Sequence, residues 1–347
     1  MVGFPLPLSA SPLKGFELRT MIKIHDIADG VRNGNLRSLA KAITLIESRS
    51  PDHSVAATTL LDELLPDSGK AIRIGISGVP GVGKSTFIEA LGLHLVKQNY
   101  KVAVLAVDPS SQLSGGSILG DKTRMEELSR EPHAFIRPSP AGDTLGGVAR
   151  KTRETMLLCE AGGYDVIIVE TVGVGQSEIT VASMVDMFLL LQLPGAGDEL
   201  QGIKRGVMEI ADAIIINKAE GENRPRAELA GQQYENALHM MAPKSLSWQV
   251  PVQLCSALHN EGIDEVWQQA VQFREAMQQS GEFDSKRSKQ NSDWMWTLLM
   301  DDLKDYFMRD RSIEALLPQV QESVAKGIST PSAAARRLLE TFKKIKY

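Results

Sequence analysis

The sequence contains the stretch Gly78-Val79-Pro80-Gly81-Val82-Gly83-Lys84-Ser85-Thr86, which matches the pattern G-x-x-x-x-G-K-[ST] at every fixed position. Residues 71–77 before it read as a buried strand, and residues 87–96 after it carry apolar side chains at helical spacing. Glycines let successive backbone N–H groups turn toward phosphate oxygens, and the N-terminus of a helix adds its positive dipole end. A glycine-rich turn without a ligand is the alternative, but the complete motif in this context favours a phosphate-binding loop.

Two side chains of this loop have specific tasks at a nucleoside triphosphate. Lys84 can reach the β- and γ-phosphates, and the Ser85 hydroxyl can bind Mg²⁺. The loop residues that we expect to bind the nucleotide are Gly78, Val79, Gly81, Val82, Gly83, Lys84, Ser85 and Thr86.

Composition narrows the class of protein. The chain has 347 residues, of which 43% are hydrophobic, enough for one large domain with extensions or for two domains. Its net charge of −5 gives no electrostatic support for nucleic-acid binding, and its apolar runs are too short to cross a membrane. Cys159 and Cys255 lie in apolar patterns, which indicates a reducing compartment. We expect a cytoplasmic protein, with residues 1–21 as a disordered leader and Met21 as an alternative start.

Short β-branched runs alternate with helical stretches from residue 71 onward, which predicts a parallel sheet. The expected strands are residues 71–77, 101–107, 134–137, 164–170, 186–192, 213–217 and 250–255. The predicted fold class is α/β, a P-loop NTPase with a mostly parallel, doubly wound sheet in residues 69–278. Residues 22–68 are expected to form a helical N-terminal extension, and residues 279–347 a helical C-terminal arm.

The arm has its own pattern. Residues 284–292 are polar and charged, as is typical of a linker, and the following residues place an aromatic and apolar stripe on a long helix. Such a stripe can be an intramolecular core or a dimerisation surface, and the pattern leaves both open. Thr330 and Pro331 form a good N-cap and first residue for a last helix over residues 332–343.

Polar residues follow several expected strands at the carboxyl edge of the sheet, where doubly wound folds bind ligands. Asp108 is suited to hold a Mg²⁺-bound water, although an aspartate before proline also opens turns; we favour the metal role. Glu170 ends a Walker-B-like strand and would lie behind the metal, while the Gly173 amide could approach the γ-phosphate. Val174, rather than a water-orienting glutamine, follows Gly173, which predicts slow intrinsic hydrolysis.

Two glycine-rich, charged loops are candidate switches. In residues 115–124, either Asp121 or Arg124 could contact the nucleotide or a partner, and a solvated loop is an equal alternative. In residues 193–205, Lys204 could stabilise the transition state, or it could be a solvated lysine.

Residues 214–220 resemble the N-K-x-D guanine element, with Glu220 in place of the aspartate, and residues 255–258 resemble the S-A-K/L loop. Asn217 would tie loops together, and the stem of Lys218 would cover the base. We expect GTP rather than ATP, with a preference for guanine that the longer Glu220 could weaken. The residues expected around the base are Asn217, Lys218, Glu220, Ser256, Ala257 and Leu258.

Taken together, these segments resemble the methylmalonyl-CoA mutase-associated GTPases, a family once labelled arginine/ornithine/lysine transport kinase. It is related to the nickel-insertion and signal-recognition-particle GTPases. The segments that carry the resemblance are residues 84–86, 108–111, 115–121, 170–178 and 195–204. The resemblance implies a homodimeric G-protein chaperone in which GTP binding and hydrolysis gate adenosylcobalamin delivery to a B₁₂-dependent acyl-CoA mutase and protect that enzyme.

The resemblance also assigns roles by position, with GTP or GDP and Mg²⁺ as cofactors. Ser85, Asp108 and Glu170 would serve Mg²⁺. Asp121 would lie in a switch near the metal, and Gln201 and Lys204 in a third switch that the mutase orders. The catalytic residues would be Lys84, Asp121 and Lys204.

Two other classes of nucleotide-binding protein fit the sequence less well. A metal-insertion GTPase needs soft or imidazole ligands at metal spacing, and the six scattered histidines and two distant cysteines do not supply them. A small-molecule kinase needs an acceptor pocket and a base beside the γ-phosphate, and no such constellation stands out in the sequence.

Overall fold

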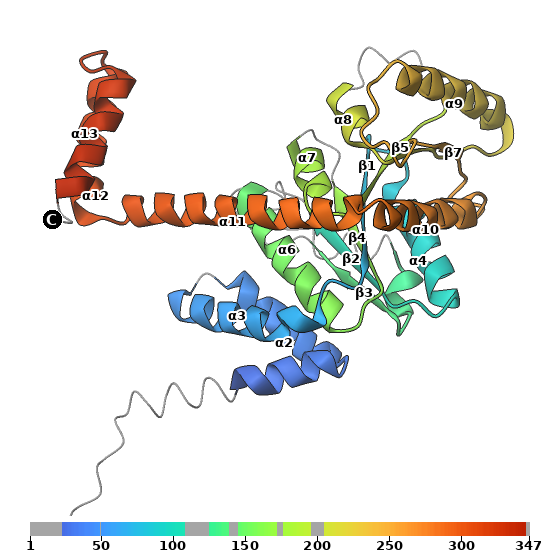
Figure 1. Ribbon diagram of the computed structural model, residues 1–347, viewed down its shortest axis with the longest axis horizontal. Helices are drawn as coiled ribbons and strands as arrows, with labels where there is room; N and C mark the ends of the chain where they lie inside the picture. Colours follow the sequence, from blue (N-terminus) through green and yellow to red (C-terminus); the bar gives the residue numbers. More distant parts are fainter. Residues whose placement is uncertain are drawn as a thin grey trace, which may run out of the picture. The chain divides into compact units, whose positions relative to one another are not determined.

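The computed structural model describes residues 23–48, 50–107, 125–138, 145–171, 176–195 and 205–344 (Figure 1). Within them, seven strands form one sheet in the order β3-β2-β4-β1-β5-β6-β7, and each ladder between neighbours is parallel. The strands are β1 (Ile72–Gly78), β2 (Val102–Val107), β3 (Ala134–Arg137), β4 (Val166–Thr171), β5 (Met187–Gln192), β6 (Ala213–Ile216) and β7 (Val252–Leu254). The predicted α/β class is confirmed, and every expected strand is present.

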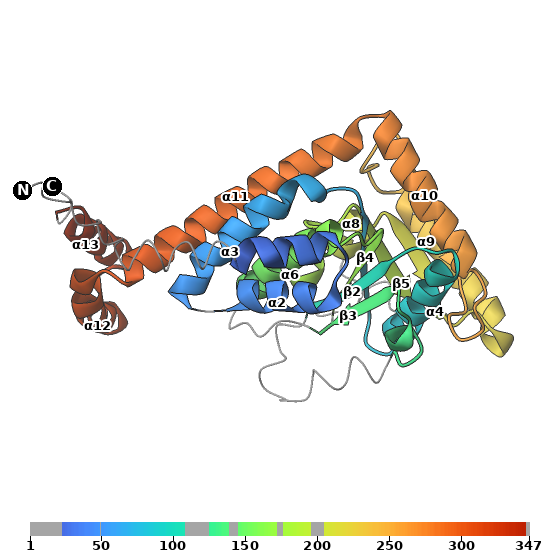
Figure 2. The same ribbon diagram turned by 90° about the horizontal axis from the view of Figure 1, so that it is seen from below.

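Helices cover both faces of this sheet. The helices of the described residues include α2 (Leu36–Glu47), α3 (Pro51–Leu64), α4 (Lys84–Lys97), α6 (Leu145–Ala161), α7 (Gln176–Ala182), α8 (Arg205–Ile210), α9 (Arg224–His239), α10 (Ile263–Gln279), α11 (Glu282–Met308), α12 (Arg311–Ala325) and α13 (Pro331–Lys344). On one face, α4 and α10 lie side by side (Figure 2) over Ile74 and Ile76 of β1. On the other, α6 and α7 bury apolar side chains against the strands, and α9 packs on β6 and β7.

Aspartates fix the amino edge of the sheet. One stands immediately before each of β4, β5 and β6, and its carboxylate accepts a hydrogen bond from a backbone N–H at the start of a neighbouring strand. The acceptor–donor pairs are Asp165 with Lys101 at 2.8 Å, Asp186 with Arg73 at 2.8 Å and Asp212 with Phe188 at 2.9 Å. These carboxylates help to hold the strands in register at the amino edge, and the opposite, carboxyl edge is where doubly wound sheets bind ligands.

The N-terminal helices pack on the sheet domain. A helix over residues 23–32, α2 and α3 share an apolar core with Leu158 and Ala161 of α6. Arg73 and Glu160 form a buried ion pair. The Arg73 guanidinium donates two hydrogen bonds to the Glu160 carboxylate, of 2.9 and 2.8 Å. Glu160 also accepts from the Gly69 N–H at 2.7 Å, which ties the segment before β1 to α6.

The chain divides into two compact units after Asp284. Gly281, which has φ +75°, separates α10 from α11. The linker expected over residues 284–292 is wrong because these residues lie inside α11. That segment holds neither glycine nor proline, so its polarity indicates a solvated helix rather than a loop.

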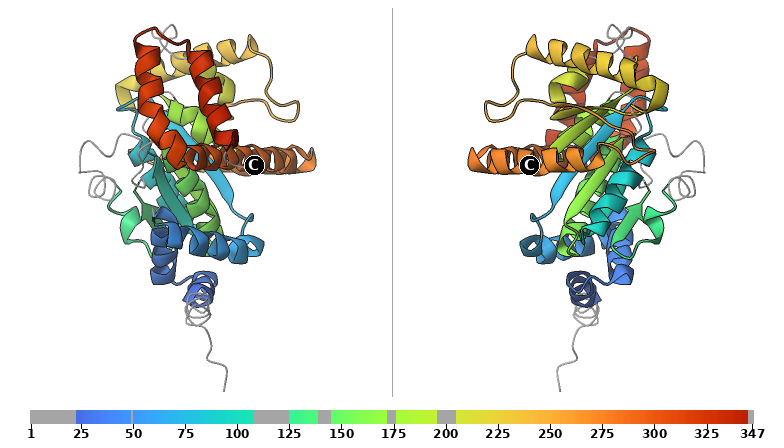
Figure 3. Two further views of the ribbon diagram at one scale, coloured as in Figure 1. Left: turned by 90° about the vertical axis from the view of Figure 1, so that its left-hand side faces the viewer. Right: turned by 90° about the vertical axis from the view of Figure 1, so that its right-hand side faces the viewer.

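In the second unit α12 and α13 lie side by side (Figure 3), and Phe342 of α13 contacts Tyr306 and Phe307 of α11 edge-on. Thr330 caps α13 as predicted, since its hydroxyl accepts from the Ala333 N–H at 3.2 Å. No helix in the described ranges is long and apolar enough to span a bilayer.

Candidate nucleotide-binding site

The glycine motif forms the connection from β1 to α4 at the carboxyl edge of the sheet. Gly81 and Gly83 have φ of +79° and +92°, the left-handed region that side chains disfavour. A Cβ at Gly83 would lie 2.9 Å from the Asn217 Nδ2, and one at Gly78 only 2.5 Å from the Leu191 carbonyl oxygen. The loop therefore needs glycine at these positions for its conformation and for the close approach of its neighbours.

Lys84 is the first residue of α4, and its ammonium turns back over the loop. The Nζ donates to the Gly78 carbonyl at 2.8 Å and to the Val79 carbonyl at 3.3 Å. The charge thus stands beside the loop backbone, where the phosphates of a nucleotide would lie.

Two of the predicted metal ligands meet in space. The Ser85 hydroxyl donates to Oε1 of Glu170 at 3.3 Å, because the parallel pairing of β1 with β4 sets Glu170 opposite Ile76. A hydroxyl and a carboxylate side by side form an oxygen donor set that suits Mg²⁺. The candidates that lie outside the described residues are Asp108, Asp121, Arg124, Gly173, Gln201 and Lys204.

Asn217 joins the phosphate loop to the second predicted loop. Its Nδ2 donates to the Val82 carbonyl at 2.9 Å, and its Oδ1 accepts from the Ala257 N–H at 3.1 Å. The side chain is buried, and the following Lys218 takes a φ of +61°, a conformation that is uncommon outside glycine and concentrates at functional sites. The phosphate loop follows β1, Asn217 follows β6 and Ala257 follows β7, so the predicted tie between the loops is present.

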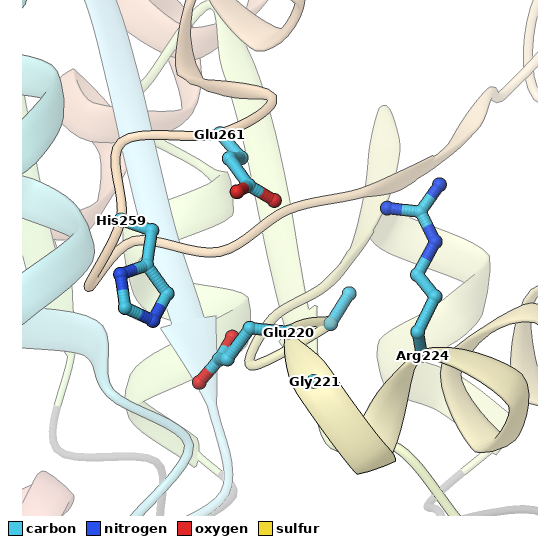
Figure 4. A pocket seen from close by; sticks show the side chains of 6 residues that line it. Glu220, Gly221, Arg224, His259 and Glu261 are labelled. Carbon is cyan, nitrogen blue, oxygen red and sulfur yellow. The ribbon is translucent and has the colours of Figure 1, made fainter.

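A cavity of about 540 Å³ opens between the segment after β6 and the loop after β7. In Figure 4, the side chains of Glu220 and His259 extend from opposite loops into the same space, while Arg224 stands at the far edge. The Glu220 Oε2 is buried and has no hydrogen-bond partner within the described part of the chain. The residues that line the cavity are Ala219, Glu220, Gly221, Arg224, His259 and Glu261.

His259, Glu261 and Arg224 are lining residues that the sequence patterns did not indicate. His259 directly follows the S-A-L triplet and Glu261 stands two residues further on. Ser256 and Glu261 exchange two backbone hydrogen bonds of 2.9 and 3.0 Å, which close the loop. Their closeness to the triplet is the signal that could have identified them. Burial raises the pKa of the Cys255 thiol to about 12, so this neighbouring thiol stays protonated near neutral pH and supplies no nucleophile.

The sheet order, the glycine loop and the adjacent Ser85 and Glu170 oxygens define a P-loop NTPase. Comparison with known families then narrows the class, because the family model described as methylmalonyl Co-A mutase-associated GTPase MeaB matches residues 39–312. The chain belongs to this family, as its sequence motifs predicted.

Relatives along most of the chain agree with this assignment. A protein of Caulobacter vibrioides is 55% identical over 309 residues, which cover 89% of this chain and 94% of the relative. GTPase ArgK of Escherichia coli is 47% identical, with 89% and 94% of the two chains covered. The mitochondrial methylmalonic aciduria type A homolog of Mus musculus is also 47% identical, with 90% and 78% covered.

A solved structure shares the architecture. It is described as LAO/AO transport system kinase, is 40% identical in sequence, and superposes with a TM-score of 0.75 over 93% of this chain and 98% of its own.

Proposed function

We propose that this protein is a cytoplasmic G-protein chaperone for a B₁₂-dependent acyl-CoA mutase, and that it binds GTP with Mg²⁺ and hydrolyses it to GDP and phosphate. The observation that carries the nucleotide part is the pair of Asn217 hydrogen bonds, because they unite the phosphate loop and the base loop in one site. The name of the family, which associates its members with methylmalonyl-CoA mutase, supports the choice of partner.

Guanine is the base that the cavity would select. Guanine offers two N–H groups on one edge, and the buried, unpaired Oε2 of Glu220 is an acceptor that such a group would satisfy. Adenine presents no N–H at the corresponding ring nitrogen and would leave the carboxylate unpaired. The backbone N–H of Ala257 is already held by Asn217, which positions the Ser256–Leu258 loop around the base.

Magnesium would be held by Ser85 and Glu170, with Asp108 as a further acidic group, and would neutralise charge on the β- and γ-phosphates. Lys84 would hold the same phosphates from the loop side, and the Gly173 amide would meet the γ-phosphate. Hydrolysis by the protein alone would be slow because Val174 follows Gly173 where a water-orienting glutamine would stand. Asp121 and Lys204 are the side chains that we propose to complete the catalytic set when the mutase binds.

A homodimer formed by the C-terminal arm is part of the proposal. Large apolar side chains are exposed on α11 at steps of three and four residues, the spacing of a helix–helix seam. The exposed members of this α11 seam are Met295, Trp296, Leu299, Met300, Leu303 and Tyr306.

The metal-insertion alternative finds little support in the described part of the chain. Its one group of histidine and carboxylates with metal spacing is His25, Asp29 and Glu63. Arg32 already pairs with both carboxylates, at 3.0 and 3.3 Å, and so competes with a metal for them.

The decisive experiment measures GTP turnover with and without a cobalamin-dependent acyl-CoA mutase. We expect slow turnover by the protein alone and a clear increase on adding the mutase, together with a dependence of cobalamin loading on GTP. Unchanged turnover would remove the chaperone assignment, and transfer of labelled phosphate from ATP to arginine would establish the kinase alternative instead.

Replacing Lys84 tests the phosphate loop itself. Lys84→Ala should weaken GTP binding by at least ~10-fold, because one charge-assisted contact to phosphate is worth about 1.5–3 kcal/mol. Equilibrium binding of GTP measures the effect, with Lys97→Ala at the far end of the same helix as control. An unchanged affinity would show that the loop does not hold the nucleotide.

A further inference from the structure

A chain of buried hydroxyl groups ends on a carboxylate beneath the phosphate loop. The Thr171 Oγ1 donates to the Ser77 Oγ at 2.8 Å, and the Ser77 Oγ donates to Oε1 of Glu178 at 3.2 Å. The exposed fractions of these residues are 1%, 0% and 6%, so water does not screen the interaction. We call this set the Glu178 relay.

The packing of α7 on β1 explains why Glu178 reaches this place. A Cβ at Gly75 would lie 2.9 Å from side-chain carbons of Val181 and Val185, so the absence of one lets α7 come close to the strand. Glu178 precedes Val181 by three residues and shares its face of the helix, while Ser77 follows Gly75 by two and shares its face of the strand. The two steps bring carboxylate and hydroxyl together at the carboxyl end of β1.

Both hydroxyl groups stand next to parts of the nucleotide site. Ser77 directly precedes Gly78, the first residue of the phosphate loop, and Thr171 directly follows Glu170, the carboxylate that accepts from Ser85. The relay therefore links the backbone that enters the phosphate loop to the backbone that carries the metal carboxylate.

The carboxylate is incompletely satisfied, which distinguishes it from a purely structural buried acid. Within the described residues, Oε2 of Glu178 and the Oγ of the adjacent Ser177 have no hydrogen-bond partner. A buried acid with one weak donor destabilises a fold that apolar side chains would serve better. A buried polar atom without a hydrogen-bond partner is rare in a native protein and calls for a functional or structural reason.

We propose that Glu178 is a positioning residue for the magnesium site, which acts through Ser77 and Thr171 to fix the phosphate loop relative to Glu170. The inference rests on the proposed binding of Mg²⁺ and GTP. It assigns Glu178 to the metal-dependent part of nucleotide affinity and not to the contacts with the base or with the phosphates alone.

The test is a Mg²⁺ titration of the binding of a non-hydrolysable GTP analogue to the full-length chain, with a parallel measurement in EDTA. Glu178→Ala should raise the Mg²⁺ concentration for half-maximal binding by about 10- to 100-fold, the usual effect of removing a group that orients a metal ligand. Affinity in EDTA should stay within about threefold of the wild type. Glu178→Gln keeps an oxygen that can accept from Ser77. Its Mg²⁺ concentration for half-maximal binding should therefore lie close to that of the wild type.

Glu154→Gln provides the matched control, because Glu154 is a similarly buried carboxylate on α6 that pairs with Arg150 outside the relay. Its Mg²⁺ dependence should equal that of the wild type. Should Glu178→Ala fail to fold, Ser77→Ala interrupts the relay with a smaller change and decides the question by the same titration. An unchanged Mg²⁺ dependence in the folded relay variant, or equal losses in Glu178→Gln and Glu178→Ala, would overturn the inference. A wild type that binds no GTP would instead overturn the proposed function.

Discussion

Asn217 uses both the nitrogen and the oxygen of its side-chain amide in hydrogen bonds, and the sequence motif predicted this role. Its place in N-K-x-[DE] predicted that it would tie two loops together, and the bonds to Val82 and Ala257 are that tie. The motif also predicts that Glu220 contacts the base, and this stays a prediction. It did not disclose His259 across the cavity, because that position depends on how the chain closes between Ser256 and Glu261.

Glu220 is the residue on which base selectivity should depend. Glu220→Ala should weaken GTP binding by about 10- to 100-fold, since a hydrogen bond to a charged group contributes about 1.5–3 kcal/mol. ATP binding should change little, because adenine lacks the donor. Glu220→Asp should preserve or strengthen the preference for GTP.

Competition between GTP and ATP for one fluorescent nucleotide measures both variants. Glu222→Ala is a suitable control, because Glu222 is exposed two residues away on the same loop. Equal affinities of the wild-type protein for the two nucleotides would refute the role of Glu220.

At the scale of the element, glycine and β-branched runs predicted the seven strands because a buried parallel strand needs a nearly continuous apolar run. Over residues 284–292 the polar composition predicts a linker, whereas the chain is helical there. Polarity reports exposure to water and not backbone conformation, so a solvated helix without glycine or proline has the same appearance. The Glu178 relay could not be predicted from the sequence, because it depends on tertiary packing. It follows from the approach of α7 to Gly75 and from the register of β1 with β4.

The Arg73–Glu160 pair should be a large contributor to the stability of the first unit. Glu160→Ala should lower its free energy of unfolding by about 3–5 kcal/mol, because the guanidinium would be left buried and unpaired. The double replacement Arg73→Met with Glu160→Leu should recover most of the loss, since apolar side chains replace the pair without a buried charge.

Chemical denaturation followed by circular dichroism measures the three proteins. Arg224→Ala removes an exposed ion pair with Glu228 and should cost less than about 1 kcal/mol. A loss of that small size in Glu160→Ala would mean that the pair is not effectively buried.

For the whole molecule, the α11 seam leads to a prediction about assembly. Leu299→Asp should convert a dimer to a monomer, because a charge at the centre of an apolar helix–helix contact is left desolvated. Sedimentation analysis gives the mass, and GTP affinity should be retained because the phosphate and base loops belong to the other unit.

Asp301→Asn lies on the same helix and changes an exposed polar residue, so it should leave the mass unchanged. A wild-type protein that sediments as a monomer, or a dimeric Leu299→Asp variant, would contradict a dimer built on this surface.

The link through Asn217 has a consequence for the kinetics of nucleotide capture. Residues from three distant parts of the chain are already locked together at the base and at the phosphate loop, so the entropy of ordering them is lost during folding and not during encounter. Association at this end of the site should therefore be limited by diffusion and orientation, and differences in nucleotide affinity among variants should appear mainly in residence time.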